Sequence, residues 1–195
     1  MAFNQDHIKW FRDSSPYIDT HRGRTFVLCL PDLALQSANL NNIISDITLL
    51  TSLGVRLVAV FGTDQQVSDR LTVDWPSKGE HRITSSEIMQ TIIGVTGTMT
   101  SALMSRISAS HLDSPGTKSD IPTVSGNFLR ARLLGTIDGI DHLQSGDIRR
   151  VNADVMHHQL EGGSIVLIPT IGYSPSGEIF HLETRNTASH VARAL

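Results

Sequence analysis

Arg82 is the residue whose type and position first suggest binding chemistry. It lies in His81-Arg82-Ile83-Thr84, just before a long predicted helix. Thr84 with Glu87 three residues later matches a capping box, which explains Thr84 but not Arg82. A guanidinium beside a helix start can hold a carboxylate through two parallel hydrogen bonds. Arg82 is therefore a candidate ligand-binding residue.

Two turns that follow predicted strands are further candidates, because ligands gather where the strands of an open parallel sheet end. Gly62-Thr63-Asp64 follows the second strand. Gly62 would let the backbone approach a ligand, and Thr63 or Asp64 can cap the next helix, whose free amides attract anions. A purely structural cap is the competing interpretation, since Asp64 would repel an anion. The turn after the first strand, Pro31-Asp32-Leu33, has no Gly or Lys and lacks a kinase-type phosphate cradle.

Other chemistries leave no signature. The chain has 9 His, but the adjacent pair His157-His158 would point about 100° apart on a helix and cannot share a metal. HExxH, GxSxG, GxGxxG and GxxxxGK[ST] patterns are missing from the sequence. We therefore expect no metal site, and the residues alone leave the chemistry of the site unresolved.

Composition narrows the function classes further. The 195 residues are 39% hydrophobic and 18% charged, with a net charge of -3, which argues against disorder and against nucleic-acid binding. One cysteine, Cys29, excludes an internal disulfide and suits a reducing compartment. The N-terminus lacks a secretion signal, and no apolar run reaches the roughly 18 residues of a membrane span. We expect one soluble, cytoplasmic domain with no membrane contact.

The elements that must position these residues alternate between strands and helices. An N-terminal aromatic helix is expected to end before Pro16 and to pack either on its own core or on a neighbouring subunit. A strand at 25–30, expected to be buried on both faces, a helix ending at Gly54 and a strand at 55–61 form a β-α-β unit with parallel strands. Further along we expect a helix at 85–110, strand-like segments and hairpins at 122–147, a helix at 151–160 capped by Asn152, a strand at 164–169 and a helix at 184–195.

Several longer stretches carry a family resemblance: FRDSSPYIDTHRGRTFVLCL, HRITSSEIM, SGNFLRAR, GTIDGIDHLQSGDIRRVN and IGYSPSGEIFHL. Together, and in this order, they resemble bacterial N-acetylglutamate synthase through essentially the whole chain. The resemblance implies an α/β class with a three-layer amino-acid-kinase-like (carbamate-kinase-like) fold and a mainly parallel central sheet, incomplete at the C-terminus. It also implies a helical segment at 1–20 that serves oligomerisation and a kinase-like domain at 21–195, with the acetyltransferase domain absent.

The family transfers an acetyl group from acetyl-CoA to L-glutamate, the first step of arginine biosynthesis, and its C-terminal acetyltransferase domain does this chemistry. The resemblance thus implies that this chain is a regulatory and assembly portion with no catalytic residues and no cofactor of its own. Acetyl-CoA is then a co-substrate of the full-length enzyme. The implied partners are L-arginine as feedback inhibitor, or glutamate or acetylglutamate as ligand, and further copies in a homo-oligomer.

Acetylglutamate kinase shares this fold, and the resemblance allows a comparison. The kinases place Lys and paired glycines where this chain has Leu30-Pro31-Asp32-Leu33, and a catalytic acid near the stretch from His181 to Asn186, where an arginine stands here. Arg82 matches the arginine that holds the acylamino-acid carboxylate in the kinases. Two alternatives remain open: a stand-alone pseudokinase-like regulator that binds amino acids, and, less favoured, an acetylglutamate kinase.

Overall fold

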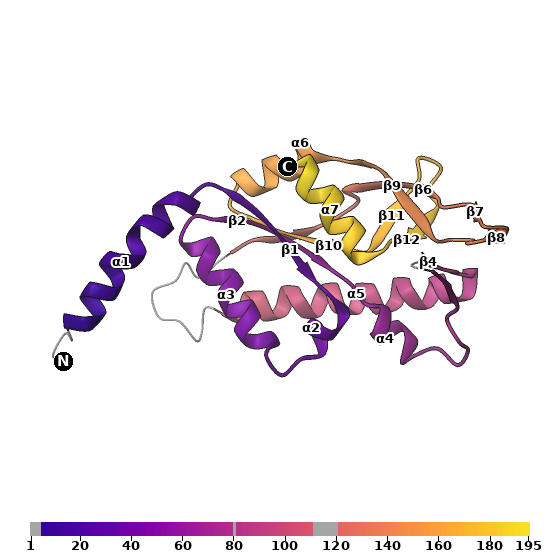
Figure 1. Cartoon of the computed structure of the whole chain (residues 1–195), viewed down its shortest axis with the longest axis horizontal. Coiled ribbons are helices and arrows are strands. Elements are labelled where there is room, and N and C mark those ends of the chain that lie inside the picture. The colour runs from indigo at the N-terminus through magenta and orange to yellow at the C-terminus, as the bar shows by residue number, and fades with distance from the viewer. Residues whose placement is uncertain (1–4, 80, 111–120) are drawn as a thin grey trace.

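The computed structural model describes residues 5–79, 81–110 and 121–195, with side chains placed from Lys9 onward except at Phe11. Two four-stranded sheets form its framework, in the orders β1-β2-β10-β5 and β12-β11-β6-β9. Helices cover both faces of the first sheet (Figure 1). This three-layer α/β arrangement confirms the predicted fold class.

The first sheet is parallel throughout. It contains β1 (Thr25–Leu30), β2 (Arg56–Phe61), β10 (Ile165–Pro169) and β5 (Thr123–Ser125). Strand β10 is completely buried, as its apolar sequence predicts. Strand β1 was expected to be buried on both faces, but that prediction is wrong: most of it is half-buried and Cys29 is exposed. The reason is the strand order, which places β1 at the edge of the sheet.

The alternation of side chains along β2 sorts the helices into two layers. Leu57, Ala59 and Phe61 pack in one cluster with α3 (Leu40–Ser52) and α5 (Ser86–Ala109). Val58 and Val60 point to the opposite face, where α6 (Ala153–Glu161) and α7 (Thr184–Ala194) lie. Two short helices, α2 (Asp32–Gln36) and α4 (Asp64–Ser68), follow the carboxyl ends of β1 and β2. These turns therefore lie at one end of the sheet, as the sequence predicts.

The second sheet extends the molecule beyond this end (Figure 1). It is mixed: β11 (Ile171–Tyr173) runs parallel to β6 (Leu129–Leu133) and antiparallel to β12 (Ile179–His181), and β6 is antiparallel to β9 (Gly146–Val151). Two separate antiparallel ribbons have two strands each: β3–β4 (Ser77–Lys78, His81–Arg82) and β7–β8 (Thr136–Ile137, Ile140–Asp141). The predicted hairpins are confirmed.

Three local predictions are wrong. Helix α1 (Gln5–His21) passes through Pro16 and projects from the body in Figure 1. Pro16 has no amide to donate to the carbonyl of Arg12, but Arg12 lies on an exposed part of the helix, where water can satisfy that carbonyl. The cap of α5 is Ser85, whose Oγ accepts from the amide of Ile88, whereas Oγ1 of the predicted cap, Thr84, lies 2.9 Å from Oγ of Ser145. Asn152 precedes α6 without a side-chain cap bond.

Among the residues that the structure describes, no helix is both long enough and apolar enough to cross a lipid bilayer.

Candidate functional site

A cavity of about 220 Å³ lies where the carboxyl end of β2 meets the second sheet. Its walls come from the start of α4, from β4, from the residue after β6, from the start of β9 and the residue before it, from the end of β12 and from the cap of α7. The residues that line it are Asp64, His81, Arg82, Leu134, Ser145, Gly146, His181 and Glu183. Arg82, predicted from sequence, is thus part of the cavity wall.

Arg82 is held in place by three contacts. Its Nη1 donates a hydrogen bond to the carbonyl of Trp75 at 3.0 Å, and its Nε lies 3.5 Å from Oδ2 of Asp64. The guanidinium carbon lies 4.6 Å from the centre of the Trp75 ring, a cation–π contact. The side chain keeps 31% of its surface exposed, so it has donors left for a ligand.

Asp64 joins Arg82 to a buried histidine. Its Oδ1 lies 3.1 Å from Nε2 of His181, which is only 4% exposed, and the His181 ring packs edge-on against Trp75 at 4.9 Å. Burial by itself would raise the pKa of Asp64, but the hydrogen bond and charge of His181, together with Arg82, outweigh it and lower that pKa below its usual value. Asp64 is therefore a carboxylate at neutral pH.

The backbone of Arg82 is fixed as firmly as its side chain. Its carbonyl accepts a hydrogen bond from Oγ of Ser145 at 2.6 Å and lies 3.0 Å from Nδ1 of His142. Oγ of Ser145 is also 2.9 Å from Oγ1 of the buried Thr84. Because these contacts link β4 to the segment before β9, the position of Arg82 in the cavity is set by residues about 60 positions away in sequence.

Gly62 and Thr63 lie beside this cavity without lining it. A Cβ at Gly62 would overlap the hydroxyl of Thr184 and lie 3.3 Å from its Cβ and Cγ2. Thr63 is 2% exposed, and its Oγ1 lies 3.2 Å from Oγ1 of Thr96. The space around both residues is filled by protein side chains, and ligand binding by either stays a prediction.

In the turn after β1, the side chain of Asp32 supplies a negative charge. Oδ2 of Asp32 accepts a hydrogen bond from the amide of Gln65 in the first turn of α4 at 3.0 Å, and its Oδ1 accepts from the amide of Leu33 at 2.9 Å. The amide of Gln65 is one that an approaching phosphate would otherwise use. A carboxylate in this place also repels a second anion.

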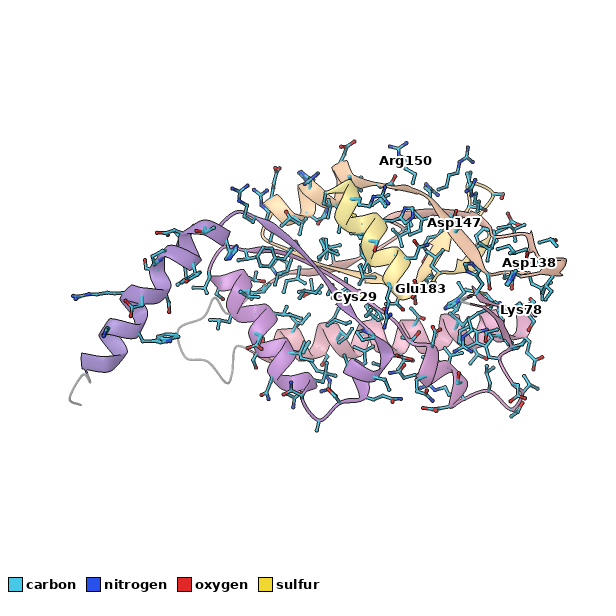
Figure 2. All side chains as sticks on the ribbon, viewed as in Figure 1. Cys29, Lys78, Asp138, Asp147, Arg150 and Glu183 are labelled. Carbon is cyan, nitrogen blue, oxygen red and sulfur yellow. The ribbon has the colours of Figure 1, made fainter. Side chains whose placement is uncertain are left out.

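The start of α7 adds further charges. Glu183 caps this helix, accepting from the amides of Arg185 and Asn186. A second cavity of about 510 Å³ adjoins the first and shares His81, Leu134, Gly146 and Glu183 with it. Figure 2 shows Glu183 at the start of α7 and Asp147 on β9, two carboxylates of the second cavity. We call the two cavities together the polar groove.

The polar groove combines both signs of charge. Arg82 and Arg185 supply guanidinium groups, and Asp64, Asp147 and Glu183 supply carboxylates. Such a lining fits a small zwitterion, whose carboxylate and ammonium groups need opposite partners. Within the described ranges, no cluster of three or more His, Cys, Asp or Glu residues has the arrangement of a metal site.

Comparison with known proteins relates this chain to one family. Residues 25–195 match the amino acid kinase family. An amino-acid acetyltransferase of Ectopseudomonas mendocina is 40% identical over 190 residues, an alignment that covers 96% of this chain and 44% of the relative. The chain thus spans less than half the length of the curated relatives that it matches.

Solved structures agree. N-acetylglutamate synthase from Neisseria gonorrhoeae, complexed with coenzyme A and N-acetyl-glutamate, superposes with a TM-score of 0.87 at 32% identity over 96% of this chain and 43% of the other. The same enzyme complexed with coenzyme A and L-arginine gives 0.82 at 31% identity, over 95% of this chain and 44% of the other. Carbamate kinase from Giardia lamblia shares the fold alone, at 12% identity over 88% of this chain and 67% of the other, with a TM-score of 0.57.

Proposed function

This chain belongs to the amino acid kinase family, and from that premise we propose that it is the kinase-like regulatory and assembly part of an N-acetylglutamate synthase. The full-length enzyme of this proposal transfers an acetyl group from acetyl-CoA to L-glutamate in arginine biosynthesis, in the cytoplasm. The helical segment at 1–20 serves assembly, and residues 21–195 form the sensor. The acetyl transfer takes place in a separate acetyltransferase domain, so acetyl-CoA is a co-substrate of the whole enzyme and not a cofactor of this chain.

The observation that carries the proposal is the 40% identity to an amino-acid acetyltransferase over 96% of the chain, with no large region left unmatched. The superposition on the synthase of Neisseria gonorrhoeae in complex with L-arginine supports the regulatory role.

The polar groove is the proposed ligand site. Arg82 presents a guanidinium that is 31% exposed and already oriented by Trp75 and Asp64, which suits the carboxylate of an amino acid. Glu183 caps α7 and Asp147 pairs with Arg132 at 3.0 Å, and both carboxylates lie in the adjoining cavity. Their remaining acceptor capacity suits an ammonium or guanidinium group. The ligand is L-arginine in the regulatory proposal, with glutamate or acetylglutamate as the alternatives.

The turn after β1 supports the function of a sensor more than that of a kinase. Asp32 already supplies a carboxylate to the amide of Gln65 at the start of α4, so a nucleotide phosphate would meet both an occupied donor and a negative charge. Phosphorylation of acetylglutamate by the protein in the presence of ATP would contradict this part of the proposal.

Helix α1 supports the assembly role. Trp10 and Tyr17 on this projecting helix are 69% and 71% exposed, which is unusual for large aromatic side chains on a helix. We propose that they pack against a second copy of the chain in a homo-oligomer.

Ligand titration of the Arg82 variants tests the proposal. Trp75 contacts Arg82 and His181, so its fluorescence reports on the polar groove, and Trp10→Phe removes the other tryptophan signal. In that background, three ligands are titrated: L-arginine, L-glutamate and N-acetylglutamate. Each is added to the protein with Arg82 unchanged and to the Arg82→Lys and Arg82→Ala variants. Loss of a charged hydrogen bond costs about 2 kcal/mol, or roughly a 30-fold weaker affinity, for Arg82→Ala.

Arg106→Ala is the matched control, because Arg106 bonds Asn41 at the far end of α5. We expect Arg82→Lys to fall between wild type and Arg82→Ala, since an ammonium keeps the charge but loses the bidentate geometry. Equal affinities in folded Arg82 and Arg82→Ala proteins would remove Arg82 from the site. No binding of any of the three ligands to the wild type would contradict the sensor role.

A further inference from the structure

A second concentration of charge lies on the exposed face of the second sheet, outside the polar groove. Arg130 on β6 and Arg149 and Arg150 on β9 line one open hollow of about 600 Å³, with Pro175 as its remaining wall. We call these three residues the arginine triad. Figure 2 shows Arg150 pointing outward from β9.

A β-bulge gathers the triad on one face. Arg130 pairs with Arg150, but the next residue, Ala131, pairs with Ile148, so Arg149 is the extra residue of the bulge. In a regular strand Arg149 and Arg150 would point to opposite faces. The bulge brings both to the same hollow, and bulges commonly re-aim side chains in this way.

Repulsion among the three guanidinium groups of the arginine triad destabilises the sheet unless an anion binds them. Arg130 and Arg150 are directly opposed like charges on neighbouring strands, a pairing that destabilises a sheet. Arg132, two residues along β6, has an ion pair to Asp147 at 3.0 Å. In the part of the chain that the structure describes, no carboxylate lies within 4.0 Å of a side-chain nitrogen of the triad.

The opposite face of these strands explains why the triad cannot simply turn inward. Leu129, Ala131 and Ile148 are buried there in the core cluster that includes Phe180 and Val191. The alternation of apolar and basic residues therefore places the three guanidinium groups on the outer face, in the hollow.

From this geometry we propose that the arginine triad binds a small molecule carrying a chain of phosphate groups. A guanidinium matches the geometry of phosphate oxygens through paired hydrogen bonds, and three of them on adjacent strands can hold one multiply charged group. The hollow has the volume of a small-molecule site. An extended acidic peptide would spread its carboxylates over a longer strip than one cross-strand row of arginines covers. The 195-residue chain carries a net charge of -3, so the attraction for an anion is local to this hollow.

Calorimetric titration with inorganic triphosphate tests the proposal directly. We expect one site on the wild type, an affinity that falls as salt is raised, and roughly tenfold weaker binding for each of Arg130→Gln, Arg149→Gln and Arg150→Gln. Arg106→Gln is the control, because it makes the same change in net charge on α5 and should bind as the wild type does. Thermal unfolding of each variant without ligand checks that it folds.

Two further titrations, with a nucleoside triphosphate and with an oligoglutamate peptide, identify the molecule that carries the phosphate groups and test for an acidic protein partner. A nucleoside triphosphate that binds more tightly than inorganic triphosphate at the same site supports the proposal and identifies a nucleotide as the source; equal affinities support it for the phosphate chain alone. An oligoglutamate peptide that binds at the triad while inorganic triphosphate does not compete would overturn it in favour of an acidic protein partner. Failure of triphosphate to bind the folded wild type, or equal weakening by all four substitutions, would also overturn it.

Discussion

Replacing Gly62 by alanine is expected to destabilise the protein, because the added methyl group has no room. It would overlap the hydroxyl of Thr184 and lie 3.3 Å from the Cβ and Cγ2 of the same residue. Rotating the Thr184 side chain does not remove the contact with its Cβ, and a β-branched side chain has few alternative rotamers. Either α7 or the end of β2 must therefore shift.

The cost follows from the packing on both sides of this contact. Phe61 before Gly62 is completely buried, and α7 inserts the fully buried Thr187 and Val191 into the core. Overpacking a core position of this kind costs about 1–3 kcal/mol. For a chain of 195 residues, a loss of about 2 kcal/mol lowers the melting temperature by roughly 4–8 °C.

Chemical and thermal unfolding of a double-mutant cycle measures this contact. Thr184→Ala removes the hydroxyl and methyl groups that the new Cβ would meet, so Gly62→Ala should cost much less in the Thr184→Ala background, with a coupling of about 1 kcal/mol or more. Gly94→Ala, in the middle of α5, is the matched control, because a Cβ there meets no atom of the described residues within 4 Å. Alanine also favours a helix, so stability should be unchanged or slightly higher.

The same variant separates packing from ligand binding at this turn. If Gly62 mainly keeps the backbone open to a ligand, Gly62→Ala will unfold at the wild-type temperature and lose ligand affinity. That outcome, or the same loss of stability with and without the Thr184 side chain, would refute the packing argument.

Two other expected outcomes concern Asp64 and helix α1. Burial opposes the ionisation of Asp64, but His181 and Arg82 together hold its pKa below the usual value. Its carboxylate therefore stabilises the fold fully above about pH 4, and this contribution is lost as the pH falls through the lowered pKa. Urea unfolding from pH 6 downward should show a steeper loss of stability for wild type than for Asp64→Asn, and parallel curves would contradict this. The double variant Trp10→Ala/Tyr17→Ala should lower the oligomer mass in sedimentation experiments. Val155 is an exposed apolar residue on α6, and Val155→Ser should leave the mass unchanged. An unchanged mass in the double variant would exclude α1 from assembly.

Much of the fold follows from local sequence patterns. The apolar runs at β2 and β10 and the 3.6-residue periodicity of α3 and α5 predict these elements, because burial requires those patterns. The edge position of β1 could not be predicted, since an apolar run shows that a strand is suited to burial but not which strands flank it. The prediction that the first helix ends before Pro16 failed because this part of α1 is exposed, so water can satisfy the carbonyl that a proline leaves without a donor.

The site is less accessible to sequence than the fold. Arg82 could be singled out because capping did not explain it. Its partners could not, since Asp64 and His181 are 117 positions apart and the carbonyl of Arg82 meets Ser145 across 63. Trp75 gave no signal, because a lone tryptophan in a polar stretch looks like any other core residue. The arginines of the triad were hidden by the bulge, which places two consecutive residues on one face.

The network around Thr84 joins the polar groove to a long rigid element. Thr84 is bonded to Ser145 on one side and adjoins Ser85, the cap of α5, on the other. Helix α5 has 24 residues, which corresponds to about 36 Å, and Arg106 near its far end bonds Asn41 in α3. For a helix of that length that moves as one body, a tilt of about 5° at the groove displaces the other end by about 3 Å. A small tilt at the groove would thus reach the contact between Arg106 of α5 and Asn41 of α3, at the other end of the helix.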